Sequence, residues 1–442
     1  MARQVRAPVS SNALAAVFDG ALTAALANLP CRFASQSRHL ISAVSGGPDS
    51  MALAQLAAAY AARHGATHRA IVVDHGLRQG SAAEAVRVAA RLRGLGITAD
   101  VLEVTARPVS TGIQEWARAR RYDLLLREAR RTGGCLLMGH HAADQAETVM
   151  MRLARGSGLS GLAGMRQATF REGVAILRPL LAADRAAILD HCDDEGLVFE
   201  RDPSNGDSRF ERVRCRHALA AMDRSGAAWS SGLLRLSRAA AEIDSALLDG
   251  LAGAGLLTSL SATGHMTLQV GALRLPEPAL MRLLAQVIRL VAAPRHGPGQ
   301  EALGRLGTRL RDNRPATLGG VRFTLVGQEW LATAEIGRRP PQCRVAAGER
   351  VLFAGNWLVG SPVDAMVRYL GEAGSGPRAG WQDSTGWSGV PSLVRRSLPV
   401  LETLDGGLLY PHLIPHGRNV RTDVMATAKC LRHACAPSGE AI

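Results

Sequence analysis

Short apolar runs alternate with helical apolar spacing along residues 38–220. Runs of consecutive apolar residues are typical of strands buried on both faces, and apolar residues at every third or fourth position are typical of helices that cover them. We expect strands at 39–44, 69–74, 98–104 and 135–139, with a shorter one near 174–178. We expect helices at 50–64, 81–94, 114–131, 142–155 and 183–195. The alternation predicts an α/β fold, with a doubly wound parallel sheet between two helical layers.

The pattern changes twice further along the chain. Residues 207–256 and 278–292 carry apolar residues at helical spacing. From about residue 320 this spacing fades, and Gly and Pro turn signals separate short apolar runs. We therefore expect four parts: an N-terminal helical lead-in (1–37), a catalytic domain (38–225), a helical middle domain (226–335) and a small C-terminal α+β domain (336–442) with a disordered tail.

The composition fits several globular domains without a membrane anchor. The chain has 442 residues, 47% of them hydrophobic, and is too long for one ordinary core. Outside alanine-rich helical pattern, no uncharged apolar run reaches the roughly 18 residues that suggest a membrane span. The seven cysteines include no C-x-x-C pair, and no clear signal-peptide core precedes Cys31. We therefore expect a protein of the reducing cytoplasm.

The chain is strongly basic. Its formal net charge is +14, and an excess of this size favours a polyanion partner such as nucleic acid. Arginines gather in the stretches 118–131 and 209–216, as a row of phosphate contacts requires. The alternative is a general drift toward arginine in a GC-rich genome, because Lys429 is the one lysine of the chain.

A polar turn joins the first expected strand to the helix that follows it. Its residues are Ser45, Gly46, Gly47, Pro48, Asp49 and Ser50. Adjacent glycines let backbone N–H groups approach an anion, and the helix adds the positive end of its dipole. The turn lacks the Gly-Lys-Ser/Thr of a Walker A loop and the G-x-G-x-x-G spacing of a dinucleotide loop. It predicts a pyrophosphate-binding loop; the alternative is an ordinary βα turn rich in small residues.

Two further expected strands end in polar clusters. Asp-His-Gly-Leu-Arg at 74–78 follows one strand, and His-His-Ala-Ala-Asp-Gln-Ala-Glu-Thr at 140–148 follows another. Ligands of open parallel sheets bind outside the carboxyl ends of the strands. We therefore expect the three clusters to face one crevice.

The acids in these clusters have competing interpretations. Asp49, beside a phosphate site, is the first candidate ligand for Mg²⁺. Asp144 and Glu147 share one helix face, where they either hold a metal or a substrate ammonium group, or only complement the helix dipole. Zinc is a weaker interpretation, because no other pattern completes a ligand set. Asp74 either contacts the nucleotide or caps the turn that follows it.

The order of these motifs resembles the N-type ATP pyrophosphatases, which share an SGGxDS loop, and within them the tRNA(Ile)-lysidine synthetase family. The resemblance rests on segments 45–50, 74–78, 117–122, 140–148, 152–162, 178–181 and 202–205, followed by Arg212, Arg214 and Arg216. It covers residues 38–220, and its most specific parts are the HHxxDQAET and RGSGLSGL blocks. The sequence departs from the family at Val213, where an asparagine is common.

The resemblance implies an adenine nucleotide alpha hydrolase-like domain and one reaction. The wobble cytidine of an isoleucine tRNA with a CAU anticodon is adenylated, with release of pyrophosphate, and free L-lysine then attacks C2 and expels AMP. ATP and Mg²⁺ are the implied cofactors. We expect Asp49, Asp144 and Glu147 to be catalytic, and residues 45–50 with Asp74 to bind ATP. The candidates for contacts to lysine or tRNA are His140, Arg118, Arg121, Arg152, Arg212 and Arg214.

Two alternative functions stay open at this point. One is another N-type ATP pyrophosphatase, for example a tRNA-thiolating enzyme, which the unpaired cysteines disfavour. The other is a non-catalytic nucleotide- or RNA-binding protein, which has little need of carboxylates beside phosphates. The sequence also leaves a homodimer open.

Overall fold

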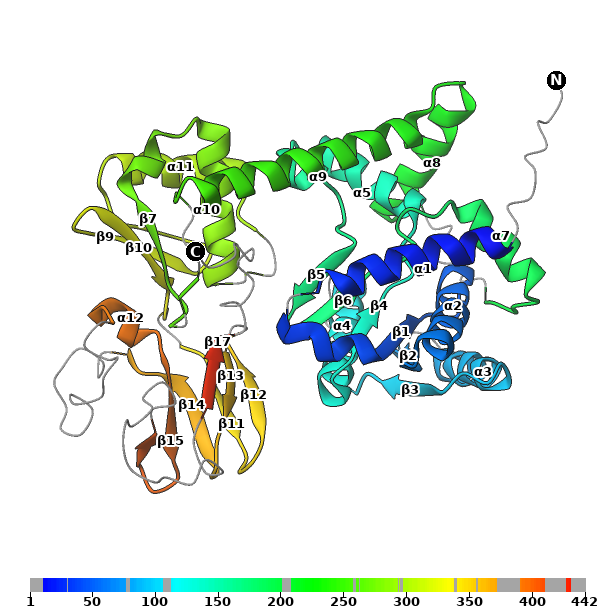
Figure 1. Cartoon of the computed structure of the whole chain (residues 1–442), viewed down its shortest axis with the longest axis horizontal. Helices are drawn as coiled ribbons and strands as arrows, with labels where there is room; N and C mark the ends of the chain where they lie inside the picture. Colours follow the sequence, from blue (N-terminus) through cyan, green and yellow to red (C-terminus); the bar gives the residue numbers. More distant parts are fainter. Residues whose placement is uncertain are drawn as a thin grey trace. The chain divides into compact units, whose positions relative to one another are not determined.

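The computed structural model divides the chain into two compact units, residues 1–242 and 243–442. The division falls inside the long helix α9 (Trp229–Gly253), which Figure 1 labels with the other elements. The structure describes residues 11–29, 31–76, 80–105, 113–200, 208–256, 260–261, 263–292, 294, 297–337, 340–354, 357–371, 390–409 and 427–430. Within these residues, no helix combines the length and apolar character needed to cross a bilayer.

Unit 1 is built on a six-stranded sheet in the order β3-β2-β1-β4-β6-β5. The strands are β1 (His39–Val44), β2 (Thr67–Asp74), β3 (Ala99–Glu103), β4 (Cys135–Leu137), β5 (Ala168–Arg171) and β6 (Val174–Leu177). Neighbouring strands are parallel except at the β5–β6 edge. The sequence did not predict β5, which joins β6 through a tight turn with positive φ at Glu172 and Gly173.

Helices cover both faces of this sheet. On one face lie α1 (Ser11–Ala27), α2 (Pro48–His64), α3 (Ser81–Gly94) and α7 (Arg185–Asp194), which share buried clusters with Leu40 and Val44 of β1. On the other face lies α4 (Ile113–Thr132), which packs Leu125 and Leu126 against Ile41. Leu40 and Ile41 serve opposite layers because successive side chains of a strand alternate between its faces. The predicted doubly wound fold is therefore confirmed, with an added antiparallel edge.

The segment after β4 begins with helix α5 (Ala142–Ala154) and the short helix α6 (Leu159–Leu162). Ala146 and Val149 of α5 form a buried cluster with Leu219 of α8 (Glu211–Arg224) and Leu233 of α9. The Gln145 amide also donates to Ser237 of α9, at 3.0 Å. These contacts hold α8 and α9 against the helix that carries the predicted acidic residues.

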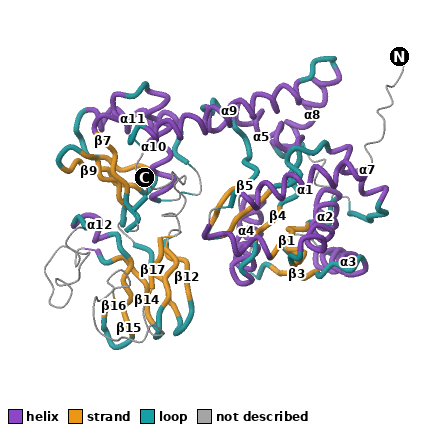
Figure 2. The backbone as a smooth tube through the Cα atoms, in the orientation of Figure 1, coloured by secondary structure: helices purple, strands orange, loops and turns teal. Residues whose placement is uncertain are grey.

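Among the described residues, unit 2 contains the end of α9, three further α-helices and three small sheets, with helices in purple and strands in orange in Figure 2. Its first sheet has the order β7-β10-β9-β8 and packs beside helices α10 (Glu277–Val291) and α11 (Gln300–Arg311). The strands are β7 (Met266–Gln269), β8 (Ala316–Leu318), β9 (Val321–Val326) and β10 (Glu329–Ala334), and a short 3₁₀ helix (Val270–Arg274) follows β7. The sequence predicted α10 but not α11 or β7. Strand β7 is only four residues long and pairs with a strand that is distant in the sequence.

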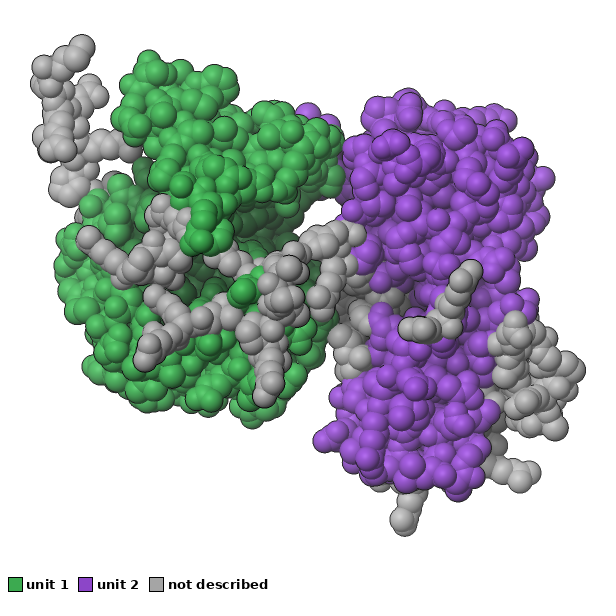
Figure 3. All heavy atoms as spheres, turned by 180° about the vertical axis from the view of Figure 1, so that it is seen from behind, with its two compact units in different colours: residues 1–242 green, residues 243–442 purple. Residues whose placement is uncertain are grey.

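The remaining sheets are antiparallel and have the orders β11-β14-β15-β16 and β12-β13-β17. Their elements are β11 (Gln342–Val345), β12 (Arg350–Phe353), β13 (Trp357–Gly360), β14 (Ala365–Tyr369), α12 (Ser392–Arg396), β15 (Pro399–Thr403), β16 (Leu408–Leu409) and β17 (Thr427–Cys430). Phe353 and Val367 share one buried cluster with Leu283 of α10. This connected core lies within unit 2, which Figure 3 colours separately. The separate middle and C-terminal domains therefore stay a prediction.

Candidate active site

The turn after β1 has the geometry of an anion-binding loop. Gly46 has φ of +86°, and a Cβ added to it would lie 2.7 Å from Cγ2 of Val88. Glycine is therefore required twice over, by the backbone conformation and by the close neighbour. Helix α2 begins immediately afterwards at Pro48, with Gly47 as its N-cap. The positive end of the α2 dipole thus lies directly behind the loop.

Ser50 holds this loop in shape. Its hydroxyl donates to the carbonyl oxygen of Gly47 at 2.9 Å and accepts from the backbone N–H of Ser45 at 3.1 Å. The hydroxyl oxygen of Ser45 is 3.3 Å from the hydroxyl oxygen of Ser50. The side chain of Ser45 is exposed, whereas Ser50 is buried. Ser45 is therefore the hydroxyl better able to reach a ligand.

The end of β4 lies against the first turn of α2. A Cβ on Gly139 would come within 2.9 Å of the carbonyl oxygen of Asp49. This close approach brings the 45–50 loop beside the N-terminus of α5, whose N-cap is His141. The prediction that the two motifs meet at one edge of the sheet is confirmed.

The imidazole of His141 lies between two carboxylates at this edge. Its Nε2 atom is 3.6 Å from Oδ1 of Asp49 and 3.5 Å from Oδ2 of Asp144. Asp144 also accepts from the His141 backbone N–H at 3.1 Å, which fixes the start of α5. Three polar side chains from two helix N-termini therefore converge.

The surroundings shift the pKa values of the acids and histidines at this edge in different directions. Burial raises the pKa of Asp49, although the charges of His141 and Arg185 oppose that effect. Burial alone would also raise the pKa of Asp144, but the nearby charges of His141 and Arg212 lower it overall. Burial and the neighbouring Arg178 lower the pKa of His140 to about 3, which keeps this imidazole neutral at physiological pH.

Glu147 is buried, with 2% exposure, and pairs with two arginines of α8. Its Oε2 accepts from Nε of Arg212 at 2.7 Å, and its Oε1 accepts from Nε of Arg216 at 2.6 Å. Arg212 also donates to Oδ1 of Asp144 at 3.0 Å. Both Glu147 oxygens are thus used within the protein, and Arg212 connects the two acids that the sequence grouped together.

The other predicted site residues have varied surroundings. Asp74 is buried, and its Oδ1 accepts from the Gly76 N–H at 2.9 Å, so it caps the turn after β2. Arg152 donates to the carbonyl oxygens of Gly161 and Gly164, each at 2.8 Å. Arg214 is exposed and donates to Ser208 and Arg209 carbonyls.

Two predicted arginines lie on α4. The guanidinium of Arg118 is 5.6 Å from the centre of the Tyr122 ring, and Arg121 lies three positions further along the same helix. Residues 77–79 and 201–207, which include parts of two motifs, lie outside the described residues. Val213, where the family pattern has a polar residue, is buried.

Three residues of this site had no role of their own predicted from the sequence. They are His141, Arg216 and Arg178. Arg178 follows β6, is buried, and donates to the Arg166 carbonyl at 2.9 Å and to Thr169 at 3.1 Å. For Arg216, the signal was its position four residues after Arg212, which places both on one helix face.

The arrangement suits a Mg²⁺ ion that is bound largely by substrate phosphates better than a metal site made of protein ligands alone. Among the described residues, no three His, Cys, Asp or Glu side chains form a metal-binding group. Oδ1 of Asp49 is buried without a hydrogen-bond partner. Mg²⁺ is commonly held by one or two carboxylates together with substrate phosphates. Asp49, with Asp144 beside it, matches this donor set, whereas zinc would need further protein ligands.

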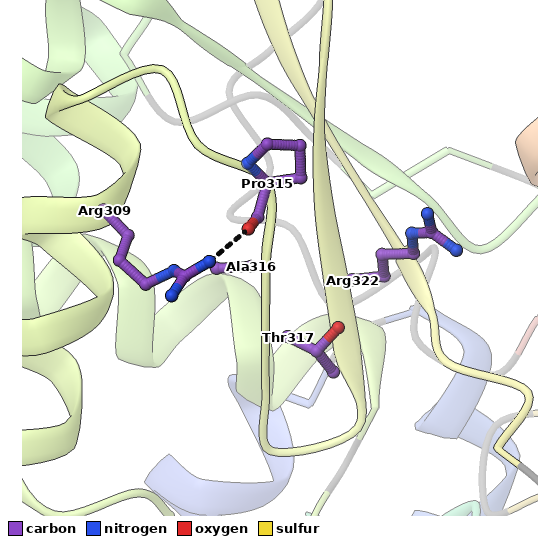
Figure 4. Close-up of a pocket in the computed structure, with 5 residues that line it drawn as sticks. All are labelled: Arg309, Pro315, Ala316, Thr317 and Arg322. Carbon is purple, nitrogen blue, oxygen red and sulfur yellow. Dashed lines mark hydrogen bonds between the residues drawn. The ribbon is translucent and has the colours of Figure 1, made fainter.

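Unit 2 contains a separate surface pocket of about 440 Å³. It is lined by Arg309, Pro315, Ala316, Thr317 and Arg322. Figure 4 shows Arg309 extending from α11 toward the carbonyl oxygen of Pro315, to which it donates at 3.2 Å. Arg309 and Arg322 are exposed, and none of the lining residues is acidic.

Comparison with known proteins agrees with this geometry. The family model described as a PP-loop domain matches residues 18–222. The tRNA(Ile)-lysidine synthase of Ruegeria pomeroyi is 34% identical over 78% of this chain and 83% of its own length. The enzymes of that name from Methylobacterium sp. and Hyphomonas neptunium are 38% and 36% identical over 69% and 76% of this chain and 91% and 92% of their own.

Among solved structures, the U34-tRNA thiolase NcsA of Methanococcus maripaludis aligns with a TM-score of 0.42 and 17% identity, over 52% of this chain and 80% of that one. The curated relatives are more similar and span most of the chain, including both compact units. The chain belongs to the tRNA(Ile)-lysidine synthase family.

Proposed function

We propose that this chain ligates lysine to C2 of the wobble cytidine in a CAU-anticodon isoleucine tRNA. The reaction consumes ATP and releases pyrophosphate and AMP. The observation that carries the proposal is the contact of Gly139 with Asp49, which joins the nucleotide loop to the carboxylates of α5. Membership of the family supplies the substrates, because the names of its curated members include tRNA(Ile) and lysidine.

In the first step, the loop at 45–50 holds the pyrophosphate part of ATP. Backbone N–H groups, the Ser45 hydroxyl and the α2 dipole supply donors and positive potential. The cytidine O2 attacks the α-phosphorus, an O–P bond forms, and the α–β bond breaks with loss of pyrophosphate. Asp49 and Asp144 are the proposed Mg²⁺ ligands, and Mg²⁺ when bound would neutralise phosphate charge.

In the second step, the lysine ε-amine attacks C2 and AMP departs with the O2 atom. A free lysine amine has a pKa of about 10.4, so it must lose a proton before it becomes a nucleophile. Asp144 is the carboxylate best suited to bind the ammonium form, because its lowered pKa keeps it anionic. Asp49, whose pKa is raised by burial, is the proposed proton acceptor of this step. Glu147, whose oxygens are occupied by arginines, acts by positioning Arg212.

For tRNA, we propose contacts by exposed arginines in both units. Arg214 and Arg118 are exposed in unit 1, and Arg309 and Arg322 are exposed at the pocket in unit 2. Phosphate contacts by such residues position an RNA without reading its sequence. A homodimer and a cytoplasmic location stay predictions.

The thiolation alternative has less support. Cys135, Cys192, Cys215 and Cys343 are free cysteines. Burial raises the pKa of Cys135 and of Cys192 to about 12, which disfavours the thiolate needed for sulfur transfer. No specific observation favours a non-catalytic binding protein. In such a protein, the buried Asp49 oxygen without a hydrogen-bond partner would lower stability and serve no reaction.

The function is tested with ATP, radiolabelled lysine and two transcripts of the isoleucine tRNA that differ only at the wobble base. Label should enter the transcript with the CAU anticodon and not the transcript with UAU. The Asp49→Asn variant should transfer lysine roughly 10²–10³-fold more slowly. Pyrophosphate release without label in either tRNA would contradict the proposal and point to another nucleotide-dependent reaction.

A further inference from the structure

His141 occupies a position that a helix start does not by itself explain. As the N-cap of α5 it is in a place where Ser, Thr, Asp or Asn is more favourable. Its side chain is buried, with 4% exposure of the residue, and its Nδ1 atom has no hydrogen-bond partner. His141 and Asp144 form a capping box at the start of α5, and this leaves the Nε2 side of the imidazole without an explanation in helix capping.

The contacts of Nε2 indicate that role. It lies 3.6 Å from Oδ1 of Asp49 and 3.5 Å from Oδ2 of Asp144, and these carboxylates belong to the first turns of different helices. Two neighbouring carboxylates repel each other, and the charge of Asp144 does act on Asp49. At these distances the contacts are electrostatic and not closed hydrogen bonds, and an N–H group placed between the carboxylates offsets their repulsion.

We propose that His141 is a positioning residue that holds Asp49 and Asp144 at a fixed spacing for Mg²⁺-bound ATP. The proposal rests on the proposed function only for the identity of the nucleotide. Its further claim is that the spacing of the two carboxylates depends on an Nε2–H group from the α5 N-cap. Arg212 holds the opposite oxygen of Asp144 at 3.0 Å, so His141 and Arg212 fix this carboxylate from two sides.

Two substitutions separate this role from helix capping. His141→Gln keeps an N–H group near the position of Nε2, whereas His141→Asn is too short to reach it. Asn is the better N-cap, so capping alone predicts that His141→Asn is at least as stable as His141→Gln. The positioning role predicts the opposite order for Mg²⁺-dependent ATP binding. The matched control is His191→Asn, which removes a buried imidazole that contacts Gln55 at 3.0 Å on α2.

The measurement is calorimetric binding of ATP across a Mg²⁺ series, with thermal melting of each variant, in the absence of tRNA and lysine. For His141→Asn the half-saturating Mg²⁺ concentration should rise about tenfold or more, and for His141→Gln at most about threefold. His191→Asn should lower the melting temperature without changing the Mg²⁺ requirement.

An unchanged Mg²⁺ requirement in a folded His141→Asn protein would overturn the positioning role. Equal increases for the Asn and Gln variants would also overturn it, because the Nε2–H group would then not be the cause. If His141→Asn does not fold, His141→Leu takes its place, and a wild-type Mg²⁺ requirement in a folded His141→Leu protein would overturn the positioning role. Since no step needs tRNA, failure of lysine transfer would contradict only the proposed function.

Discussion

The carbonyl oxygen of Asp49 lies 2.9 Å from the point where Gly139 would carry a Cβ atom. Only a glycine at the end of β4 lets the first turn of α2 come this close. The contact joins the 45–50 loop to the segment that carries His141 and Asp144. A glycine outside the 45–50 loop therefore sets the distance between the two halves of the candidate site.

Gly139→Ala should impair ATP binding more than it impairs folding. The added methyl group meets backbone atoms of Asp49, so either α2 or β4 must move by some tenths of an ångström. We expect a loss of about 1–3 kcal/mol in the free energy of unfolding, measured by urea denaturation, together with weaker ATP binding. Gly94→Ala is the control, because its Cβ would meet open space. Normal ATP binding by Gly139→Ala would show that the contact is not needed for the loop geometry.

Asp49→Asn should abolish most pyrophosphate release without loss of stability. Burial disfavours the charged form of Asp49, so a neutral side chain of the same size costs the fold little. Loss of one charged group at a phosphoryl-transfer site is expected to slow release by roughly 10²–10³-fold. Asp223→Asn removes an equal charge at the Ser230 turn and should leave the rate unchanged. Wild-type turnover of Asp49→Asn would remove this residue from the active site.

Glu147→Gln should destabilise the fold as well as the activity. It leaves Arg216 without its anionic partner and Arg212 with Asp144 alone, and both arginines are about a third exposed, at 32% and 31%. Because water reaches them, we expect the lower end of the range for breaking a buried pair, about 3 kcal/mol. Glu211→Gln, on the helix α8 that carries both arginines, breaks an exposed pair with Arg155 and should cost less than about 1 kcal/mol. Similar urea midpoints for the two variants would contradict this difference.

His68 should make the protein less stable in mild acid. Burial lowers its pKa from 6.5 to about 4. The folded state therefore binds this proton less readily than the unfolded state, and its contribution is present above pH 6.5 and is lost as the pH falls toward 4. His68→Gln, which can keep a hydrogen bond to Ser42, should reduce that loss by up to about 3 kcal/mol. Parallel stability curves for wild type and variant between pH 7 and 4 would be inconsistent with this expectation.

Arg322→Ala should weaken tRNA binding and reduce its salt dependence. Arg322 is exposed beside the pocket of unit 2, where Arg309 supplies a second positive charge. Loss of one phosphate contact should lower the slope of log affinity against log salt by about 1. Arg305→Ala removes the same charge from α11, but Arg305 pairs with Glu301 and should matter less. Equal slopes for all three proteins would exclude the pocket from the tRNA-binding surface.

Local patterns were enough to predict most of unit 1. The strands at 39–44 and 135–139 and the helices at 50–64 and 142–155 were predicted close to their observed bounds. Each is a buried run or a helical pattern bounded by turn residues, so its neighbours in sequence already define it. The strands β5 and β7 were missed, because each mixes polar with apolar residues over only four positions, and their partners are supplied by the fold.

The candidate site, like the fold, was predicted from the sequence only in part. The sequence by itself determined the phosphate loop, the acids Asp49 and Asp144 and their common edge of the sheet, because glycines, capping residues and strand ends are local features. Only the tertiary structure decided that Glu147 is occupied by Arg212 and Arg216, and that His141 lies between two carboxylates. Those relationships depend on how α2, α5 and α8 pack, and side-chain pairing across separate helices leaves no periodic signal in a single sequence.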